Sequence, residues 1–231
     1  MFIEHRIYSL TTASLPEYYA AFGAKGYKLH TDIVPCLGWY FSEAGMQSQM
    51  VSLWRYESLV DRMRRRSDLS ANPEWQAIMA KVRPMVVNVE NRLMLPVSFW
   101  DGKRPTIKPV LPKDGKGKLT SKDIPDTVPF IEHRTYTLKP AKVQQYLDTL
   151  GADGFAMIET HAPCVGFYRT EAGALNQLIS MWQFDSFEQR MERRAELAAR
   201  PDWRKKVGPL ADFVERIESK LLFCVPFYPG A

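Results

Sequence analysis

Two histidines occupy the same place in two similar stretches of the chain. His5 stands in the middle of FIEHRIYSL, and His133 stands in the middle of FIEHRTYTL. An imidazole shielded from water titrates near neutral pH, so each side chain could act as a general base or hydrogen-bond a substrate. A histidine beside isoleucines can equally be a core residue with its ring nitrogens satisfied. We name both as candidate catalytic residues, with core packing as the alternative.

The same stretches place opposite charges on both sides of each histidine. Glu4 and Arg6 flank the first histidine, and Glu132 and Arg134 flank the second. Such groups could bind or polarise a substrate, whereas a buried carboxylate–guanidinium pair can also be purely structural. We therefore expect these four residues either at a substrate-binding site or in structural ion pairs.

Aromatic residues and arginines supply the other candidates for binding. Aromatic side chains in strand-like segments could line a site for a flat apolar ligand, although they also pack into any sheet. The arginines of DRMRRRSDL, matched by those of QRMERRAEL, could hold an anionic group or could form a solvated helix face. The further substrate-binding candidates are Tyr8, Tyr40, Trp54, Tyr56, Arg62, Tyr136 and Trp182.

The sequence has no motif for a nucleotide cofactor, a serine hydrolase or a metal. It contains no GxGxxG, P-loop or GxSxG stretch. The three cysteines, Cys36, Cys164 and Cys224, and the four histidines do not follow the spacing of a zinc site. We expect no metal and no cofactor. Haem stays an alternative, because one histidine per repeat would be enough as an axial ligand.

The positive charge is concentrated in the middle of the chain. The net charge is +5, and the segment 101–129 contributes +3 from seven Lys or Arg and four Asp, which leaves +2 elsewhere. A nucleic-acid surface needs basic residues on a folded face, so we expect no nucleic-acid partner. Met1 is followed by a strand-like segment instead of a secretory signal, and no apolar run reaches the roughly 20 residues of a membrane span. The odd number of cysteines favours a reducing compartment, so we expect a cytoplasmic protein.

The chain is a tandem duplication. Residues 2–100 align with residues 130–228 without a gap, and 36 of these 99 positions are identical, which indicates a common origin. The segment between them mixes proline, glycine and charged residues without an apolar period. We expect a first repeat at 1–100, a linker at 101–129 that is the least ordered part of the chain, and a second repeat at 130–231.

Each repeat has the periodicities of a βαββαβ unit. In the first repeat, residues 15–31 and those after Ser58 recur at helical spacing, and Pro73 interrupts the second helix. The expected strands are 2–10, 37–43, 49–56 and 85–95. This order is typical of the ferredoxin-like fold, whose sheet has one face bare of helices. The expected fold class is therefore α+β, with two tandem ferredoxin-like units packed sheet to sheet and closing toward a barrel.

The alternation of the first strand also predicts which face meets the helices. Isoleucines share a face with His5, and we expect that face to pack against the helices. Glu4, Arg6 and Tyr8 would then look into the gap between the two sheets.

The sequence resembles the NIPSNAP family, part of the dimeric α/β-barrel superfamily. The resemblance rests on EHRIYSL, GWYFSEAG, VSLWRYESLVDRMRRRSDLSANPEW and KVRPM…ENRLMLP, and it covers both repeats. It implies an intrachain dimeric α/β barrel, in a superfamily of cofactor-free monooxygenases, isomerases, lyases and haem enzymes that use a pocket between sheet and helices. The second repeat departs further from the family pattern, with MWQFDS for LWRYES, so the first is expected to keep the working site. His5 and His133 stand where the family pattern has an apolar residue.

Two functions of different classes stay open. One is a cofactor-independent enzyme of the monooxygenase, isomerase or lyase type that acts on a small aromatic or otherwise hydrophobic molecule. The other is a non-catalytic small-molecule-binding or protein-interaction (adaptor) module. A cavity lined by His5 and aromatic residues would favour the enzyme, and a filled core would favour the adaptor. We expect a small hydrophobic molecule as partner and a homo-oligomer of the two-repeat chain.

Overall fold

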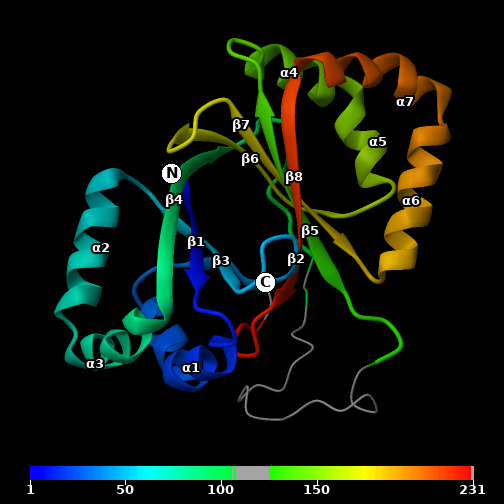
Figure 1. Cartoon of the computed structure of the whole chain (residues 1–231). Coiled ribbons are helices and arrows are strands. Elements are labelled where there is room, and N and C mark those ends of the chain that lie inside the picture. The colour runs from blue at the N-terminus through cyan, green and yellow to red at the C-terminus, as the bar shows by residue number, and fades with distance from the viewer. Residues whose placement is uncertain (106, 108–124, 230–231) are drawn as a thin grey trace. The chain divides into compact units, whose positions relative to one another are not determined.

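The computed structural model describes residues 1–105, 107 and 125–229. They form two compact units (Figure 1). The first contains Met1–Leu93 and the described residues of Thr106–Asp126 and Leu222–Ala231, and the second contains Met94–Pro105 and Thr127–Leu221. Each unit thus includes the tail of the other repeat. The repeat boundaries stay a prediction, and the expected linker at 101–129 lies largely outside the described residues.

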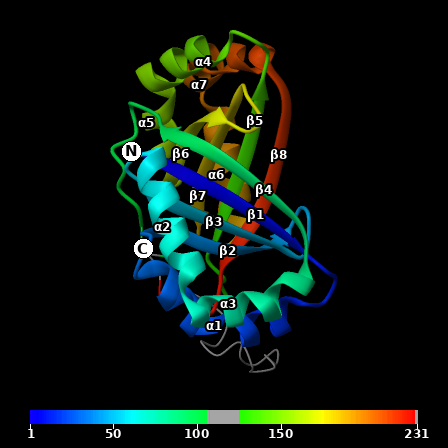
Figure 2. The same ribbon diagram turned by 90° about the vertical axis from the view of Figure 1, so that its left-hand side faces the viewer.

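The first unit has the element order expected of a ferredoxin-like fold. Its antiparallel sheet has the strand order β4-β1-β3-β2. Figure 2 shows α1, α2 and α3 on the side of this sheet that faces the viewer. The elements are β1 (Phe2–Leu10), α1 (Leu15–Thr31), β2 (Cys36–Ala44), β3 (Gln49–Tyr56), α2 (Leu59–Ala71), α3 (Pro73–Val82), a short 3-10 turn (Arg83–Met85) and β4 (Val86–Pro96).

Side-chain caps set the boundaries of α2 and α3. The Ser58 hydroxyl accepts a hydrogen bond from the backbone N–H of Asp61 and so begins α2. The Asn72 side chain accepts from the N–H groups of Glu74 and Trp75, and Pro73 occupies the first turn of α3. The interruption predicted at Pro73 is confirmed.

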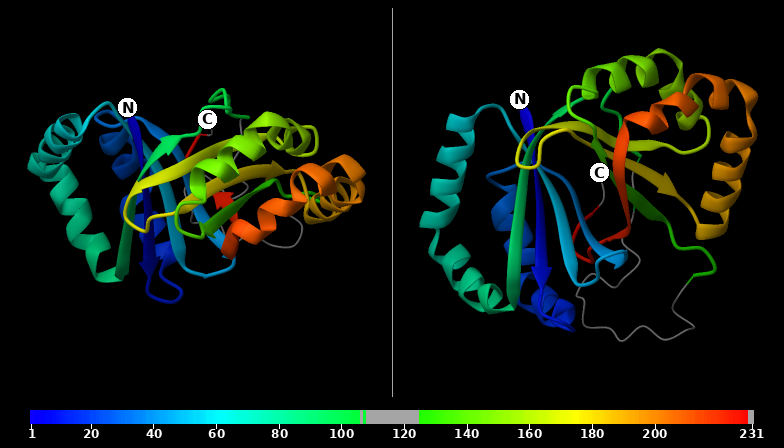
Figure 3. Two further views of the ribbon diagram at one scale, coloured as in Figure 1. Left: turned by 90° about the horizontal axis from the view of Figure 1, so that it is seen from above. Right: turned by 45° about the horizontal axis from the view of Figure 1, so that its top comes forward.

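The second unit repeats this order with a modified first helix. Its strand order is β8-β5-β7-β6, and Figure 3 shows its helices on one side of β5, β6 and β7. The elements are β5 (Phe130–Leu138), α4 (Val143–Thr149), a π-helical segment (Leu150–Gly154), α5 (Phe155–Glu159), β6 (Cys164–Ala172), β7 (Gln177–Phe184), α6 (Phe187–Ala199), α7 (Pro201–Lys206), a 3-10 segment (Gly208–Phe213) and β8 (Val214–Cys224).

Both copies of the first helix are irregular near the same glycine. In α1, Gly23 has φ +46° and ψ −157°, which kinks the helix at a residue for which positive φ costs little. The equivalent Gly151 of the second unit lies within the π-helical segment. π-helical turns widen a helix locally and are frequent at functional sites.

The predicted orientation of β1 is wrong. Arg6 and Tyr8 lie beneath the helices of their unit, and Glu4 bonds to Arg62 of α2. His5 lies on the opposite face, paired in register with Leu53. Neither face of β1 is open to solvent, since Glu4 is buried and Arg6 and Tyr8 are half-buried, so the burial of the isoleucines could not reveal which face the helices cover.

Among the described residues, no helix is both long enough and apolar enough to cross a lipid bilayer.

Candidate functional site

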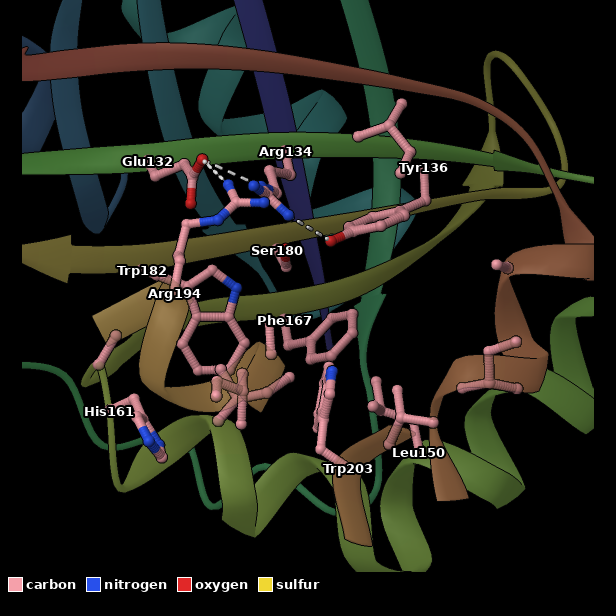
Figure 4. Close-up of a pocket in the computed structure, with 18 of the residues that line it drawn as sticks. Glu132, Arg134, Tyr136, Leu150, His161, Phe167, Ser180, Trp182, Arg194 and Trp203 are labelled. Carbon is pink, nitrogen blue, oxygen red and sulfur yellow. Dashed lines mark hydrogen bonds and ion pairs between the residues drawn. The ribbon is translucent and has the colours of Figure 1, made fainter. Parts of the chain in front are cut away.

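A cavity of about 340 Å³ lies in the second unit between its sheet and its helices. Strands β5, β6 and β7 supply one wall, and helical residues supply the others (Figure 4). Glu132, Arg134 and Tyr136 all line it, because side chains at alternate positions of a strand share one face. A cavity of this volume is of the size that small-molecule ligands occupy.

One end of the cavity is positively charged. Glu132 accepts hydrogen bonds through Oε1 from Arg190 Nη2 at 2.5 Å and from Arg194 Nη1 at 3.2 Å. Arg134 Nε lies 3.0 Å from the same oxygen. The Glu132 side chain is 3% exposed, whereas that of Arg194 is 44% exposed. One carboxylate therefore faces three guanidinium groups, and the surplus of positive charge is available to an anion.

Two hydroxyl groups stand beside this charge. Arg134 Nη1 donates to the Tyr136 hydroxyl at 3.2 Å, and a phenol that accepts one hydrogen bond still has its own proton to donate. The Ser180 Oγ atom of β7 is buried and has no hydrogen-bond partner within the described part of the chain. A buried polar atom without a partner is unfavourable, so a ligand that bonds to it would gain affinity.

The rest of the cavity is apolar and largely aromatic. Figure 4 shows Phe167, Trp182, Trp203 and Leu150 among the lining side chains. Tyr146 also lines the cavity, and burial raises the pKa of its hydroxyl above the usual range. This hydroxyl therefore stays neutral at physiological pH and adds no negative charge.

The equivalent space of the first unit is nearly filled. It measures about 80 Å³. The imidazole of His30 stacks on the indole of Trp54, with ring centroids 3.6 Å apart and planes 20° from parallel. Phe22 and Trp39 pack beside them, with centroids 4.9 Å apart. Rings of this unit itself thus occupy the volume that is open in the other.

The sequence difference behind this contrast is small. The repeats align with an offset of 128, so His30 corresponds to Ile158, Phe22 to Leu150 and Trp39 to Phe167. Each of these replacements in the second unit substitutes a smaller side chain or removes a ring. At these three positions the second unit therefore has less aromatic bulk around its cavity.

The first unit keeps the same charged cluster. Arg62 Nη2 donates to Glu4 Oε1 at 2.6 Å, and Arg6 and Arg66 lie 3.3 and 3.7 Å from that oxygen. Asn91 also donates to it. Burial raises the pKa of Glu4, but the positive charges of the three arginines outweigh burial and hold the pKa below its usual value. Glu4 is therefore ionised at neutral pH.

A buried neutral base lies beside this cluster. Burial lowers the pKa of His30 well below its usual value, and the charges of Arg6 and Arg66 lower it further. The ring is 7% exposed, and its Nδ1 atom has no hydrogen-bond partner within the described residues. The imidazole is therefore uncharged at neutral pH and packs in the core as an aromatic ring.

Comparison with known proteins identifies the family. The family model described as NIPSNAP matches residues 3–100 and 131–229. This chain belongs to the NIPSNAP family. The NIPSNAP chain is 26% identical over 223 residues to the Protein NipSnap homolog of Dictyostelium discoideum, covering 96% of this chain and 86% of that protein. It is 29% identical over 100 residues to the human Protein NipSnap homolog 3A, and the match covers 42% of this chain and 40% of that protein.

A solved structure shows the fold of the NIPSNAP chain over nearly its whole length. A protein from Lactobacillus acidophilus, described as a candidate monooxygenase, is 10% identical and superimposes with a TM-score of 0.59. The match covers 96% of this chain and 92% of that one. The predicted class, α+β with two ferredoxin-like units in the dimeric α/β-barrel fold, is confirmed.

The structure separates the predicted site residues of this NIPSNAP chain into three groups. Glu132, Arg134, Tyr136 and Trp182 line the large cavity. The residues of the first unit that belong to its charged cluster or line its small cavity are Glu4, Arg6, Tyr8, Trp54 and Arg62. The predicted residues that line neither cavity and do not belong to a charged cluster are His5, His133, Tyr40 and Tyr56.

The two histidines named first are placed away from both cavities. His5 and His133 are 0% and 1% exposed and lie on the sheet face opposite Glu4 and Glu132. Arg92 Nη1 approaches His5 Nδ1 to 3.5 Å. The catalytic role of these histidines stays a prediction, and it receives no support from the position of the cavities. Of the two equivalent spaces between sheet and helices, moreover, the larger lies in the repeat that departs further from the family pattern.

Sequence reasoning missed several lining residues. Ser180 looked like an ordinary strand residue, and Leu150, Ile158 and Trp203 looked like core positions. His161 also lines the cavity, with Nδ1 2.9 Å from the Met157 carbonyl oxygen. A comparison of the two repeats could have indicated these residues. Positions with identical residues belong to the fold that both repeats share, whereas positions at which the side chains differ in size show where one repeat can be more open than the other.

No group of three His, Cys, Asp or Glu residues that could hold a metal ion occurs in the described ranges 1–105, 107 and 125–229.

Proposed function

We propose that the second unit binds a small, mostly apolar molecule that carries one anionic or strongly electron-rich oxygen group. The observation that carries this proposal is the composition of the cavity. Arg134 and Arg194 line one end together with Glu132, the carboxylate that they share with Arg190, and aromatic walls enclose the remainder. The arginines would hold the oxygen group by charge-assisted hydrogen bonds, and the walls would remove the apolar body from water.

The same geometry supports an enzymatic function. A substrate oxygen beside Arg134 and Tyr136 would be stabilised as it gains negative charge, because both groups are already oriented by their mutual hydrogen bond. A cofactor-independent monooxygenase, isomerase or lyase whose reaction passes through an enolate or phenolate would use this stabilisation. A solved structure of the same fold, 10% identical, is described as a candidate monooxygenase. A binding module without turnover is the second candidate, and it uses the same cavity.

A pair of matched variants tests the binding site. Arg194→Gln removes one guanidinium from the cavity, and Arg66→Gln removes its counterpart in the filled first unit. We expect Arg194→Gln to weaken binding of small aromatic carboxylates, measured by calorimetry, by about tenfold, the usual order for one charge-assisted hydrogen bond. Arg66→Gln should leave the affinity unchanged. Equal losses in both variants, or no carboxylate bound by the parent protein, would refute the proposed site.

Turnover separates the two candidate functions. Ligands that bind are incubated with the protein in air, and products are analysed by mass spectrometry. An enzyme would give a product whose rate of formation falls in Tyr136→Phe, since the phenolic proton is lost while the ring remains. Unchanged ligand after prolonged incubation would favour the binding module.

A further inference from the structure

The first unit contains a ring stacked where the second unit is open. His30 lies on Trp54 with centroids 3.6 Å apart, and its edge meets Trp75 with centroids 5.2 Å apart and planes at 63°. The imidazole thus bridges two indoles, one from the sheet and one from α3. It is a planar heteroaromatic group in a buried, aromatic slot.

Both indoles are kept in the second unit, and the ring between them is absent. Trp182 and Trp203 correspond to Trp54 and Trp75, and both line the cavity (Figure 4). The residue that corresponds to His30 is Ile158, an aliphatic side chain. Within the described part of the chain, Trp203 makes no ring contact, whereas Trp75 contacts both Phe22 and His30. The second unit therefore has an aromatic slot without its central ring.

We propose that a planar aromatic ring of the ligand fills this slot on Trp182, in the place that His30 takes on Trp54. This inference rests on the proposed function and narrows it: the ligand is a flat aromatic acid or phenol, not an aliphatic one. A flat ring can approach an indole face closely, whereas a puckered saturated ring of similar size cannot. The acidic group then reaches Arg134 and Arg194 at the charged end.

A serine in the slot supports the same assignment. In the first unit, Trp54 Nε1 donates to Ser52 Oγ at 2.9 Å, so the hydroxyl is satisfied within the protein. In the second unit, the corresponding Ser180 Oγ is buried without a partner. A hydroxyl or carbonyl oxygen on the ligand ring could form a hydrogen bond with this Ser180 hydroxyl. The slot is thus matched to an aromatic ring that carries an oxygen.

The first test compares two carboxylates with the same carbon skeleton, one aromatic and flat and the other saturated and puckered. 2-Naphthoate is flat, and decahydronaphthalene-2-carboxylate is its saturated counterpart. We expect 2-naphthoate to bind about tenfold more tightly by calorimetry, because two indole contacts add to the shared anion binding. Equal affinities, or tighter binding of the saturated acid, would overturn the inference and leave the proposed site standing. Failure of both acids to bind would instead overturn the proposed function.

The second test exchanges the slots. Ile158→His places an imidazole in the second unit. We expect this variant to lose binding of 2-naphthoate, while its melting temperature stays near that of the parent protein. In the reverse direction, the triple variant Phe22→Leu, His30→Ile and Trp39→Phe should raise the binding stoichiometry from one to two. A folded Ile158→His protein with unchanged 2-naphthoate affinity would overturn the inference. If the triple variant does not fold, Ile158→His and the pair of acids decide the matter.

Discussion

Arg190 of α6 and Glu132 of β5 are joined by a hydrogen bond of 2.5 Å, although 58 residues separate them in the chain. The first unit has the same link between Arg62 and Glu4, at 2.6 Å. In each unit this bond ties a helix to the central region of the sheet. It also orients the carboxylate oxygen that holds two further guanidinium groups.

Removing this carboxylate should destabilise the second unit. Glu132→Gln leaves three guanidinium groups without their shared negative charge, so we expect the free energy of unfolding to fall by about 2–3 kcal/mol. Urea unfolding followed by circular dichroism measures the change. Glu4→Gln is the matched variant in the first unit and should show a loss of similar size. Stabilities within experimental error of the parent would show that neither cluster holds its helix.

The Glu4 cluster should make the protein sensitive to acid. The pKa of Glu4 is held below its usual value of 4.5, so the folded state binds its proton less readily than the unfolded chain. The stabilisation by Glu4 is therefore present above pH 4.5 and is lost as the pH falls through the lowered pKa of the folded state. Urea unfolding at pH values above and below 4.5 should show a steeper loss in the parent than in Glu4→Gln. Parallel curves for the two proteins would contradict this prediction.

The stacked imidazole of His30 should add a second pH dependence. Its pKa is lowered well below 6.5, so the unfolded chain takes up a proton at a pH where the folded chain does not. Stability is then complete above 6.5 and falls as the pH drops toward the folded-state pKa, with a slope of at most about 1.4 kcal/mol per pH unit. His30→Phe keeps a ring on Trp54 but cannot titrate. Its stability should change less between neutral and mildly acidic pH, and an identical pH profile would rule out His30 as the cause.

The two equivalent serines should respond oppositely to the loss of their hydroxyls. Ser52→Ala removes the acceptor of Trp54 Nε1 and should cost about 1–3 kcal/mol of unfolding free energy. Ser180→Ala removes a buried oxygen that has no partner, so the stability of the unliganded protein should stay the same or rise. Thermal unfolding of the two variants provides the comparison. A larger loss in Ser180→Ala than in Ser52→Ala would show that the hydroxyl of Ser180 is satisfied after all.

Much of the fold could be predicted because local signals agree with it. The alternation of residues 2–10 predicted β1, and Ser58 and Pro73 predicted the starts of α2 and α3, because capping and ring constraints act within a few residues. The orientation of β1 could not be predicted, since neither of its faces is open to solvent and the alternation is symmetric. The π-helical segment around Gly151 also escaped prediction, and its glycine lies against the ring of Phe99, which is distant in the sequence.

The candidate site was only partly predictable for a related reason. Glu132 and Arg134, the charged residues beside the second histidine, were identified by type, as was Trp182, and all three line the cavity of the second unit. The open space itself depends on Ile158, Leu150 and Phe167, whose types are ordinary for a core. Their significance appears only when each is compared with the larger ring at the aligned position of the first repeat. The volume of a cavity depends on all the side chains that surround it, so it cannot be predicted from the residue type at one position.

The exchange of chain ends between the units has a consequence for how the molecule can be taken apart. Phe227, near the end of the chain, packs against Tyr19, Phe22 and Trp39 of the first unit. A fragment that stops at residue 100 would lack this lid on its aromatic cluster, and a fragment that begins at 130 would lack Met94–Pro105 of its own unit. Cutting the chain between the repeats would therefore yield two incomplete pieces instead of two domains. During synthesis, the aromatic cluster on α1 is therefore complete only after Phe227 has been made and has packed against Tyr19 and Phe22.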